Sequence, residues 1–475
     1  MLLRHGLIYL VARLVPGAVA FTSLVVYTRL LSPEDYGAYI LVITTVALVH
    51  VNLFSWLELS LLRLLPAYED RPAPLLSTTL CLYLWLSAGT TAIAAVAWFA
   101  LPDPVVRRLL LVGVPILWAH AWMELNLKLC QSALMPIRYG ILLLLRSAST
   151  LCIGVALVLS GLGAFGPLLG FLVGAVLACV AAVSWQWRGV RPRLDRRLAG
   201  ELARYGLPLT GSIALIFVID SADRFMIARF LGTDDVGVYA AAYDLASQSL
   251  QVLMMVVNLA AYPLAIRAYE KEGVPGALAQ LRENGVLLLS VALPATVGIV
   301  VLAQPLADVL LGAEYRAAAR AILPWVAFGI FLAGLKVFLF DMAFQLSKRS
   351  GTMIWAVAVA ASCNVLLNFW WIPAFGVVGA AWATVVAHAL ALAVCIVLGR
   401  QLIPIEVDWS QAARIAVGCL VMAAVVLAMP APPGVFGLVA RILGGMVGYG
   451  LVAIALDVMG SRTWLAGRLR SGADA

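Results

Sequence analysis

An eleven-residue stretch near the start of the chain, Arg29-Leu-Leu-Ser-Pro-Glu-Asp-Tyr-Gly-Ala-Tyr39, recurs 200 residues later as Arg229-Phe-Leu-Gly-Thr-Asp-Asp-Val-Gly-Val-Tyr239. Five of the eleven positions are identical in the two copies. Each copy joins two apolar segments; its acids suit the start of the second helix, and its glycine gives the turn backbone freedom. The charges of the repeated loop are therefore expected to be structural, and the recurrence indicates a duplicated fold.

The composition places the chain in a membrane. Of its 475 residues, 64% are hydrophobic and only 12% are charged, and the mean hydropathy is +1.01. Soluble domains average about 45–50% apolar and about 25% charged residues, so an ordinary soluble enzyme is excluded. The net charge of +8 is distributed between apolar segments, which argues against a nucleic-acid partner. We expect an all-α, polytopic integral membrane protein.

Hydropathy predicts fourteen membrane-spanning helices of about 20 residues each. We expect them over residues 7–28, 38–61, 76–101, 109–131, 139–160, 164–187, 206–228, 238–264, 285–311, 320–345, 353–372, 377–399, 411–429 and 436–457. Six of them lie between the repeated loops, so the two copies share one orientation and define two parallel six-helix lobes. The expected parts are an N-terminal lobe (1–187), a basic cytoplasmic linker (188–205), a C-terminal lobe (206–400), and two further helices with a cytoplasmic tail (401–475).

The basic residues predict the orientation of these helices. With both termini in the cytoplasm, 19 of the 32 lysines and arginines lie on the cytoplasmic side and six on the outer side, as the positive-inside rule requires. The basic stretch 188–197 is interpreted as a topology determinant, with capture of anionic lipid as the alternative. The first apolar segment is interpreted as a retained helix and not a signal peptide, because Arg13 interrupts it.

No motif for catalysis, ATP or a metal is found in the sequence. The cysteines occur singly in apolar runs, without ligand spacing, and are expected to be core residues. They are Cys81, Cys130, Cys152, Cys179, Cys363, Cys395 and Cys419. There is no GxxxxGK[ST] sequence, and the predicted outer loops are short, which disfavours a polytopic glycosyltransferase, ligase or polymerase. We expect a protein that is not an enzyme and has no cofactor or metal.

The first forty residues carry a family resemblance. Tyr9-Leu-Val-Ala-Arg-Leu-Val-Pro-Gly17, followed by Tyr27-Thr-Arg-Leu-Leu-Ser-Pro-Glu-Asp-Tyr-Gly37, resembles the start of polysaccharide-biosynthesis (oligosaccharide) flippases. These belong to the multidrug/oligosaccharidyl-lipid/polysaccharide exporter superfamily. The repeated loop, the six-plus-six helices and the two added C-terminal helices extend the resemblance over nearly the whole chain. It implies a MATE-like, V-shaped pair of lobes around a central cavity.

The resemblance also implies a function and partners. The implied activity is alternating-access movement of undecaprenyl-diphosphate-linked oligosaccharide from the inner to the outer leaflet of the bacterial cytoplasmic membrane, for O-antigen of lipopolysaccharide, capsule or exopolysaccharide. Membrane lipids, glycosyltransferases and an outer-face polymerase or ligase are the implied partners. Because two lobes in one chain supply a complete pathway, we expect a monomer. A lipid II flippase and a cation-coupled multidrug exporter of the same superfamily are the alternatives.

Cations within the apolar segments are the candidate substrate contacts, because an ionisable side chain at mid-bilayer costs several kcal/mol. A diphosphate needs cationic donors, and guanidinium adds bidentate geometry. Snorkelling, or pairing with an acid on another helix, is the alternative for each cation. The expected diphosphate contacts are Arg13, Lys128, Arg146, Arg224 and Lys336. They favour an anionic substrate over a cationic drug.

Polar side chains also fall on shared helical faces. His120, Glu124 and Lys128 form one stripe, in which Glu124 is placed to pair with Lys128, and a structural pair and a substrate site both fit. Asp220 and Arg224 lie one turn apart and fit either an internal pair or the cavity. The helix over 238–264 presents a polar face that is expected to line the cavity. Its residues are Asp244, Gln248, Gln251 and Asn258.

Coupling and driving force complete the expectations. Glu58 and Asp341 are candidates for carrying a proton or binding Na⁺, or are interfacial, whereas His50 and His388 are interpreted as packing residues. The membrane potential supplies about 2.3 kcal/mol per charge per 100 mV. Outward movement of about two negative charges therefore gains roughly 4–5 kcal/mol per 100 mV, so the potential alone suffices, with H⁺ or Na⁺ coupling as the alternative.

Overall fold

The described part of the chain folds into helices and contains no strand. The computed structural model describes residues 2–100, 104–347, 349, 351, 353–430 and 432–462, and their side chains except those of 2–14, 104–106, 108–109, 183–186, 212 and 353. Contacts divide the chain into two compact units. Unit 1 comprises Met1–Phe225 and Thr233–Gly237, and unit 2 comprises Met226–Gly232 and Val238–Ala475.

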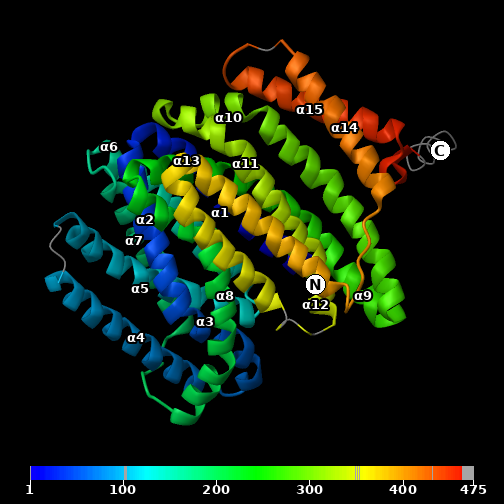
Figure 1. The fold of residues 1–475 in the computed structure, drawn as a ribbon. Helices are drawn as coiled ribbons and strands as arrows, with labels where there is room; N and C mark the ends of the chain where they lie inside the picture. The colour runs from blue at the N-terminus through cyan, green and yellow to red at the C-terminus, as the bar shows by residue number, and fades with distance from the viewer. Residues whose placement is uncertain are drawn as a thin grey trace, which may run out of the picture. The chain divides into compact units, whose positions relative to one another are not determined.

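Unit 1 contains the first seven α-helices and most of the eighth (Figure 1). They are α1 (Leu2–Leu30), α2 (Pro33–Leu53), α3 (Ser55–Leu64), the 3₁₀ turn η1 (Leu65–Tyr68), α4 (Pro72–Ala100), α5 (Pro104–Ser132), α6 (Pro136–Leu159), α7 (Phe165–Gln186) and α8 (Arg196–Phe230). Four of these helices begin with proline, which lacks the N–H that a first helical residue leaves unpaired. Since α8 begins at Arg196, the second half of the predicted linker is helical.

Unit 2 contains the remaining helices. They are α9 (Thr233–Val301), α10 (Ala303–Leu310), the 3₁₀ turn η2 (Ala313–Tyr315), α11 (Arg316–Leu335), the π-helix η3 (Lys336–Phe340), α12 (Met342–Leu346), α13 (Met353–Gly399), α14 (Trp409–Ala428), α15 (Val435–Ala455) and the 3₁₀ turn η5 (Val458–Gly460). The first turn of α9 belongs to unit 1.

The number of spans agrees with the prediction. Eleven helices of the described chain are long and apolar enough to cross a membrane. Two of these each contain two spans, because the backbone turns sharply at Gly273 (φ 66°) in α9 and at Gly376 (φ 63°) in α13; glycine tolerates such angles. The apolar part of α1, Val15–Leu30, supplies the fourteenth. The polytopic all-α fold is confirmed, although the connection expected over 265–284 is helical on both sides of Gly273.

Outward-facing side chains fit a lipid surrounding. Ile93, Val96 and Phe99 of α4 are 68%, 70% and 84% exposed, and Phe436 of α15 is 87% exposed. A soluble protein rarely presents such continuous apolar surface to water. The chain is therefore a multi-pass membrane protein.

Helices α6 and α7 pack through a row of glycines. Gly166, Gly170 and Gly174 stand four residues apart on α7 and so share one face. A Cβ on Gly170 would lie 2.6 Å from the Cα of Gly154, and one on Gly174 would lie 2.8 Å from the carbonyl oxygen of Arg146. Small residues allow this close approach of helix backbones in membranes. The row therefore fixes the position of the α6 backbone at Arg146.

The two repeated loops meet at their glycines. A Cβ on Gly37 would collide with the carbonyl oxygen of Thr233, and a Cβ on Gly237 would collide with the carbonyl oxygen of Pro33. All four residues belong to unit 1. The contact is reciprocal, as a duplicated element predicts, so the glycine shared by the two copies is required for close packing.

The acid of the first loop also has a structural role. Asp35 donates its backbone N–H to Oγ of the helix-capping Ser32 at 3.2 Å. Its Oδ1 accepts a hydrogen bond from the backbone N–H of Ala164 at 3.3 Å. These bonds join the start of α2 to the turn before α7.

Replacing Gly37 or Gly237 with alanine should destabilise the protein, because the new Cβ would meet backbone atoms that cannot move aside. Overpacking costs about 1–3 kcal/mol, so we expect a lower melting temperature when the protein is heated in detergent and assayed by size-exclusion chromatography. Gly89→Ala is the control, because a Cβ there meets nothing within 4 Å. Melting temperatures equal to the wild type for both loop variants would contradict the tight crossing.

Candidate functional site

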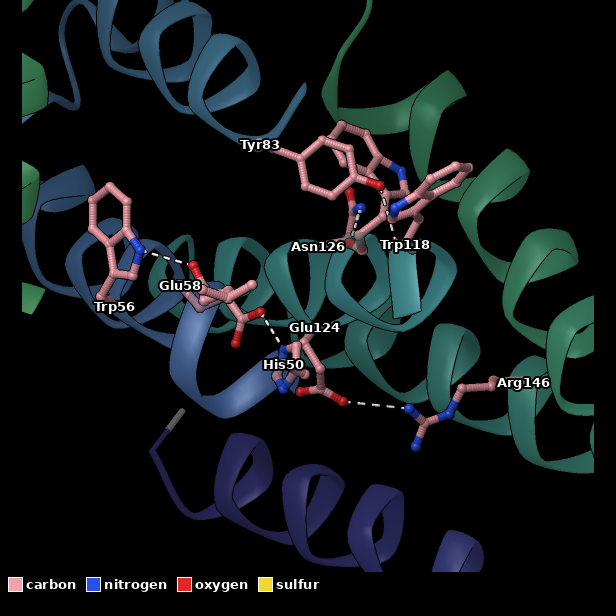
Figure 2. A network of polar contacts seen from close by, with 10 residues as sticks. His50, Trp56, Glu58, Tyr83, Trp118, Glu124, Asn126 and Arg146 are labelled. Atoms are coloured by element: carbon pink, nitrogen blue, oxygen red, sulfur yellow. Dashed lines mark hydrogen bonds and ion pairs between the residues drawn. The ribbon is translucent and has the colours of Figure 1, made fainter. Parts of the chain in front are cut away.

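Polar side chains of unit 1 converge near the junction of α2 and α3 (Figure 2). Four helices contribute to the cluster. Its members are His50 of α2, Glu58 of α3, His120 and Glu124 of α5, and Arg146 of α6. These five residues are called the buried network below.

The first pair of the buried network is a histidine and a carboxylate. Nε2 of His50 lies 2.7 Å from Oε1 of Glu58, and the two side chains are 9% and 5% exposed. The partners stand eight positions apart, on either side of Phe54, where α2 ends and α3 begins. A contact this short is a hydrogen bond, with one proton between Nε2 and Oε1. The pair keeps this hydrogen bond whether the imidazole of His50 is neutral or protonated.

His120 places a second imidazole beside the first. The ring centroids of His50 and His120 are 4.5 Å apart. Nδ1 of His120 is buried and has no hydrogen-bond partner among the described residues. Because two imidazolium ions at this separation would repel each other, at most one of the rings is expected to carry a charge.

The second pair joins α5 to α6. Nη1 of Arg146 donates to Oε1 of Glu124 at 3.3 Å, and the two side chains are 20% and 23% exposed. The guanidinium carbon also lies 6.0 Å from the ring centroid of Phe171 on α7. The hydrogen-bond partner of Glu124 is therefore Arg146, and not Lys128 as the helical spacing predicts. Lys128 follows Glu124 by one turn on α5 and adds a further positive charge to this part of the helix.

Aromatic side chains lie beside the buried network and extend away from it. The Phe54 ring lies 6.3 Å from that of His50 and 6.0 Å from that of Tyr83, and the Phe171 ring lies 5.8 Å from that of His120, centroid to centroid.

The ring of Trp122 lies 4.9 Å from that of Tyr83 and 4.7 Å from that of Trp187, centroid to centroid. Nε1 of Trp187 donates to Oδ1 of Asn126 at 2.7 Å, and the Tyr83 hydroxyl donates to the carbonyl oxygen of Trp118 at 3.0 Å (Figure 2). The indole N–H of Trp187 and the hydroxyl of Tyr83 therefore have partners within this aromatic group. The low dielectric constant of such surroundings strengthens the neighbouring ion pairs.

The residue types present limit the chemistry of the cluster. Within the described ranges, no three His, Cys, Asp or Glu side chains are grouped so as to hold a metal ion. The guanidinium of Arg146 can bind an anion. His50, Glu58 and His120 can accept or release a proton.

Unit 2 has a buried ion pair of its own. Nζ of Lys336 donates to both carboxylate oxygens of Asp341 at 2.8 and 3.0 Å, and the side chains are 9% and 3% exposed. The π-helix η3 begins at Lys336 and ends just before Asp341, and its i to i+5 pattern brings residues five apart onto one face. Sγ of Cys395 donates to Oδ1 of Asp341 at 3.1 Å. A search for acids four residues from Lys336 misses this partner.

The other predicted residues are dispersed along the chain. Nη1 of Arg224 donates to Oγ1 of Thr44 in unit 1 at 3.3 Å. In unit 2, Oε1 of Gln248 is buried without a hydrogen-bond partner among the described residues, and Gln251 is exposed. Arg13 lies outside the described side chains. Three more of these predicted residues, Asp220, Asp244 and Asn258, are half-buried.

His50 is the member of the buried network that the sequence pattern assigns to packing. An isolated histidine within an apolar segment has no partner at the usual spacing of three or four. Glu58 lies about two helical turns further on, and a search at that separation would have found it.

The chain is similar to proteins named for glycan biosynthesis. It is 27% identical over 181 residues to the amylovoran biosynthesis protein AmsL of Erwinia amylovora, a match that covers 37% of this chain and 45% of that protein. It is 23% identical over 315 residues to the probable low-salt glycan biosynthesis flippase Agl15 of Haloferax volcanii, covering 63% of this chain and 64% of that protein. The chain thus spans less than two thirds of the length of either relative.

The fold has a counterpart among solved structures. The structure of the lipid II flippase MurJ in an inward closed conformation matches with a TM-score of 0.80 at 14% identity. The match covers 95% of this chain and 99% of that chain. At this identity the likeness concerns the fold alone, and it confirms the predicted fold class.

The family of the chain is shown by a match to a family model. The model, described as polysaccharide biosynthesis protein, matches residues 26–320. This range is more than half of the chain and contains both repeated loops and the whole buried network. The chain therefore belongs to this family of polysaccharide biosynthesis proteins.

Proposed function

We propose that this protein is a flippase that moves undecaprenyl-diphosphate-linked oligosaccharide from the inner to the outer leaflet of the bacterial cytoplasmic membrane by alternating access. Family membership, a relative named as a glycan biosynthesis flippase and a fold shared with a lipid II flippase support the proposal. The translocated glycan would serve synthesis of O-antigen, capsule or exopolysaccharide.

The observation that carries the proposal is the accessible cation at Arg146. Its side chain is one fifth exposed and makes one hydrogen bond, 3.3 Å long, to Glu124 among the described residues. A guanidinium binds phosphate oxygens in bidentate geometry, and the single contact to Glu124 is one that a phosphate can replace. Lys128 adds positive charge nearby, and Arg13, Arg224 and Lys336 remain proposed contacts.

The topology and energy source follow from the same proposal. Both termini would lie in the cytoplasm, as the distribution of basic residues indicates. The membrane potential would favour outward movement of the anionic lipid, with H⁺ or Na⁺ as alternative coupling ions. Glu58, Asp220, Asp244, Gln248, Gln251, Asn258 and Asp341 are the remaining proposed polar positions. A monomer working beside glycosyltransferases and an outer-face polymerase or ligase completes the proposal.

Depletion of the protein in its own cells should trap the lipid-linked glycan on the inner face, because the diphosphate cannot cross hydrocarbon unaided. The measurement is the fraction of undecaprenyl-diphosphate-linked glycan that a membrane-impermeant glycosidase releases from spheroplasts, which should fall while the total pool rises. An unchanged pool with unchanged sidedness would contradict the proposal, and efflux of cationic drugs would be assayed next.

Arg146→Ala should slow translocation at least tenfold, because a charge-assisted hydrogen bond contributes about 1.5–3 kcal/mol. Arg146→Lys should give an intermediate rate, since it keeps the charge and loses the bidentate geometry. The rate is measured in proteoliposomes with a fluorescent undecaprenyl-diphosphate disaccharide. Arg138→Ala, at the exposed start of the same helix, is the control. Equal rates for Arg146→Ala and Arg138→Ala would remove Arg146 from the site.

Lys336→Ala should lower the yield of folded protein, because it leaves Asp341 buried without its counter-charge. Removing one partner of a buried pair costs about 3–5 kcal/mol. Lys336→Met combined with Asp341→Leu removes both charges and should restore the melting temperature in detergent. A restored double variant that still translocates the lipid would take both residues out of the proposed site.

A further inference from the structure

We infer that binding of an anion at Arg146 is coupled to uptake of one proton by the buried network of unit 1. The inference rests on the proposed function, because the anion is taken to be the diphosphate of the proposed substrate. It adds regulation of that site by pH, through residues that do not contact the anion themselves.

The fixed charges of the cluster balance when the histidines are neutral. Glu58 and Glu124 supply two negative charges, and Arg146 and Lys128 supply two positive charges. Lys128 follows Glu124 by one turn on α5. An added proton would give the cluster one net positive charge, which an arriving anion would stabilise.

The groups able to take that proton face one another. His50 contacts Glu58 at 2.7 Å, and the ring of His120 lies 4.5 Å from that of His50. Two further titratable groups on neighbouring helices are Tyr83 of α4 and Cys179 of α7. The Tyr83 hydroxyl donates to a carbonyl oxygen at 3.0 Å, and the Cys179 thiol donates to one at 3.6 Å. Both donors are therefore already engaged.

The coupling arises from competition for Arg146. A phosphate oxygen that takes the guanidinium must displace the carboxylate of Glu124. The released carboxylate would then be a partly buried charge without its partner, which is unfavourable. A proton from water that adds to Glu124, or to the imidazole of His120 one turn away on α5, cancels or offsets that charge. Anion binding and proton binding therefore favour each other.

The sign of the pH dependence follows from this exchange. Since the bound state holds one more proton than the free state, affinity increases as pH falls. The change should be about tenfold per pH unit for one proton, and should level off at low pH, where the free network is already protonated. Carrying the proton with the substrate would also reduce the charge moved across the membrane from about two to about one.

The test measures binding of undecaprenyl diphosphate to the full-length protein in nanodiscs, by tryptophan fluorescence across about pH 5 to 8. Wild-type affinity should weaken about tenfold per unit of rising pH over part of this range. Glu124→Gln removes the competing charge and should bind tightly at every pH. His388→Gln, a buried histidine of unit 2, is the control and should keep the wild-type slope.

A direct proton count makes the test independent of variant folding. Wild-type protein in weakly buffered solution is mixed with undecaprenyl diphosphate, or with inorganic diphosphate, beside a pH-indicator dye. Binding with uptake of about one proton supports the coupling, whereas binding without proton uptake, or a wild-type slope in Glu124→Gln, would overturn it. If only inorganic diphosphate binds and takes up a proton, the coupling stands and the proposed lipid substrate fails. If neither probe binds, both fail.

Discussion

A charge without a partner in a low-dielectric helix bundle costs several kcal/mol, and the arrangement of polar side chains in this protein depends on that cost. Lys336 and Asp341 meet at 2.8 Å and are almost fully enclosed. Arg146 and Glu124 meet at 3.3 Å with about a fifth of each side chain exposed. The first pair can stabilise only the fold, unless the helices around it separate. The second can exchange Glu124 for an anionic ligand, provided that a proton neutralises the released carboxylate.

Irregular backbone makes these pairs geometrically available. A regular α-helix would place residues five apart on different faces, and the π-helix over Lys336–Phe340 brings Lys336 and Asp341 together. The break at Phe54 lies between the two partners of the histidine–carboxylate pair. On α7, the glycine row lets the backbone of α6 come close at Arg146. Local backbone features thus set electrostatic contacts that regular α-helical geometry would not provide.

Hydropathy and the repeated loop were sufficient to predict fourteen spans, because the bilayer imposes a length and a polarity on every span. The partners of the buried charges were not predictable in the same way. Helical spacing pairs Glu124 with Lys128, whereas the structure pairs it with Arg146 on another helix. That choice depends on how α5 and α6 pack, which no periodicity records. The same limit applies to Gly37 and Gly237. The repeat shows that both loops carry a glycine at this position, but it does not show that the two loops pack against each other there.

A carboxylate that already occupies an anion site lowers the affinity of the site for an anionic substrate. If Arg146 stood alone, its pairing with a diphosphate would gain the full charge interaction, and release would be correspondingly slow. With Glu124 already bound, only the difference between two anionic partners contributes to affinity, so binding stays moderate although each contact is strong. When the substrate departs, Glu124 pairs with Arg146 again, and the empty site is electrically neutral. A neutral empty site is the state in which a carrier can return across the membrane without moving charge against the potential.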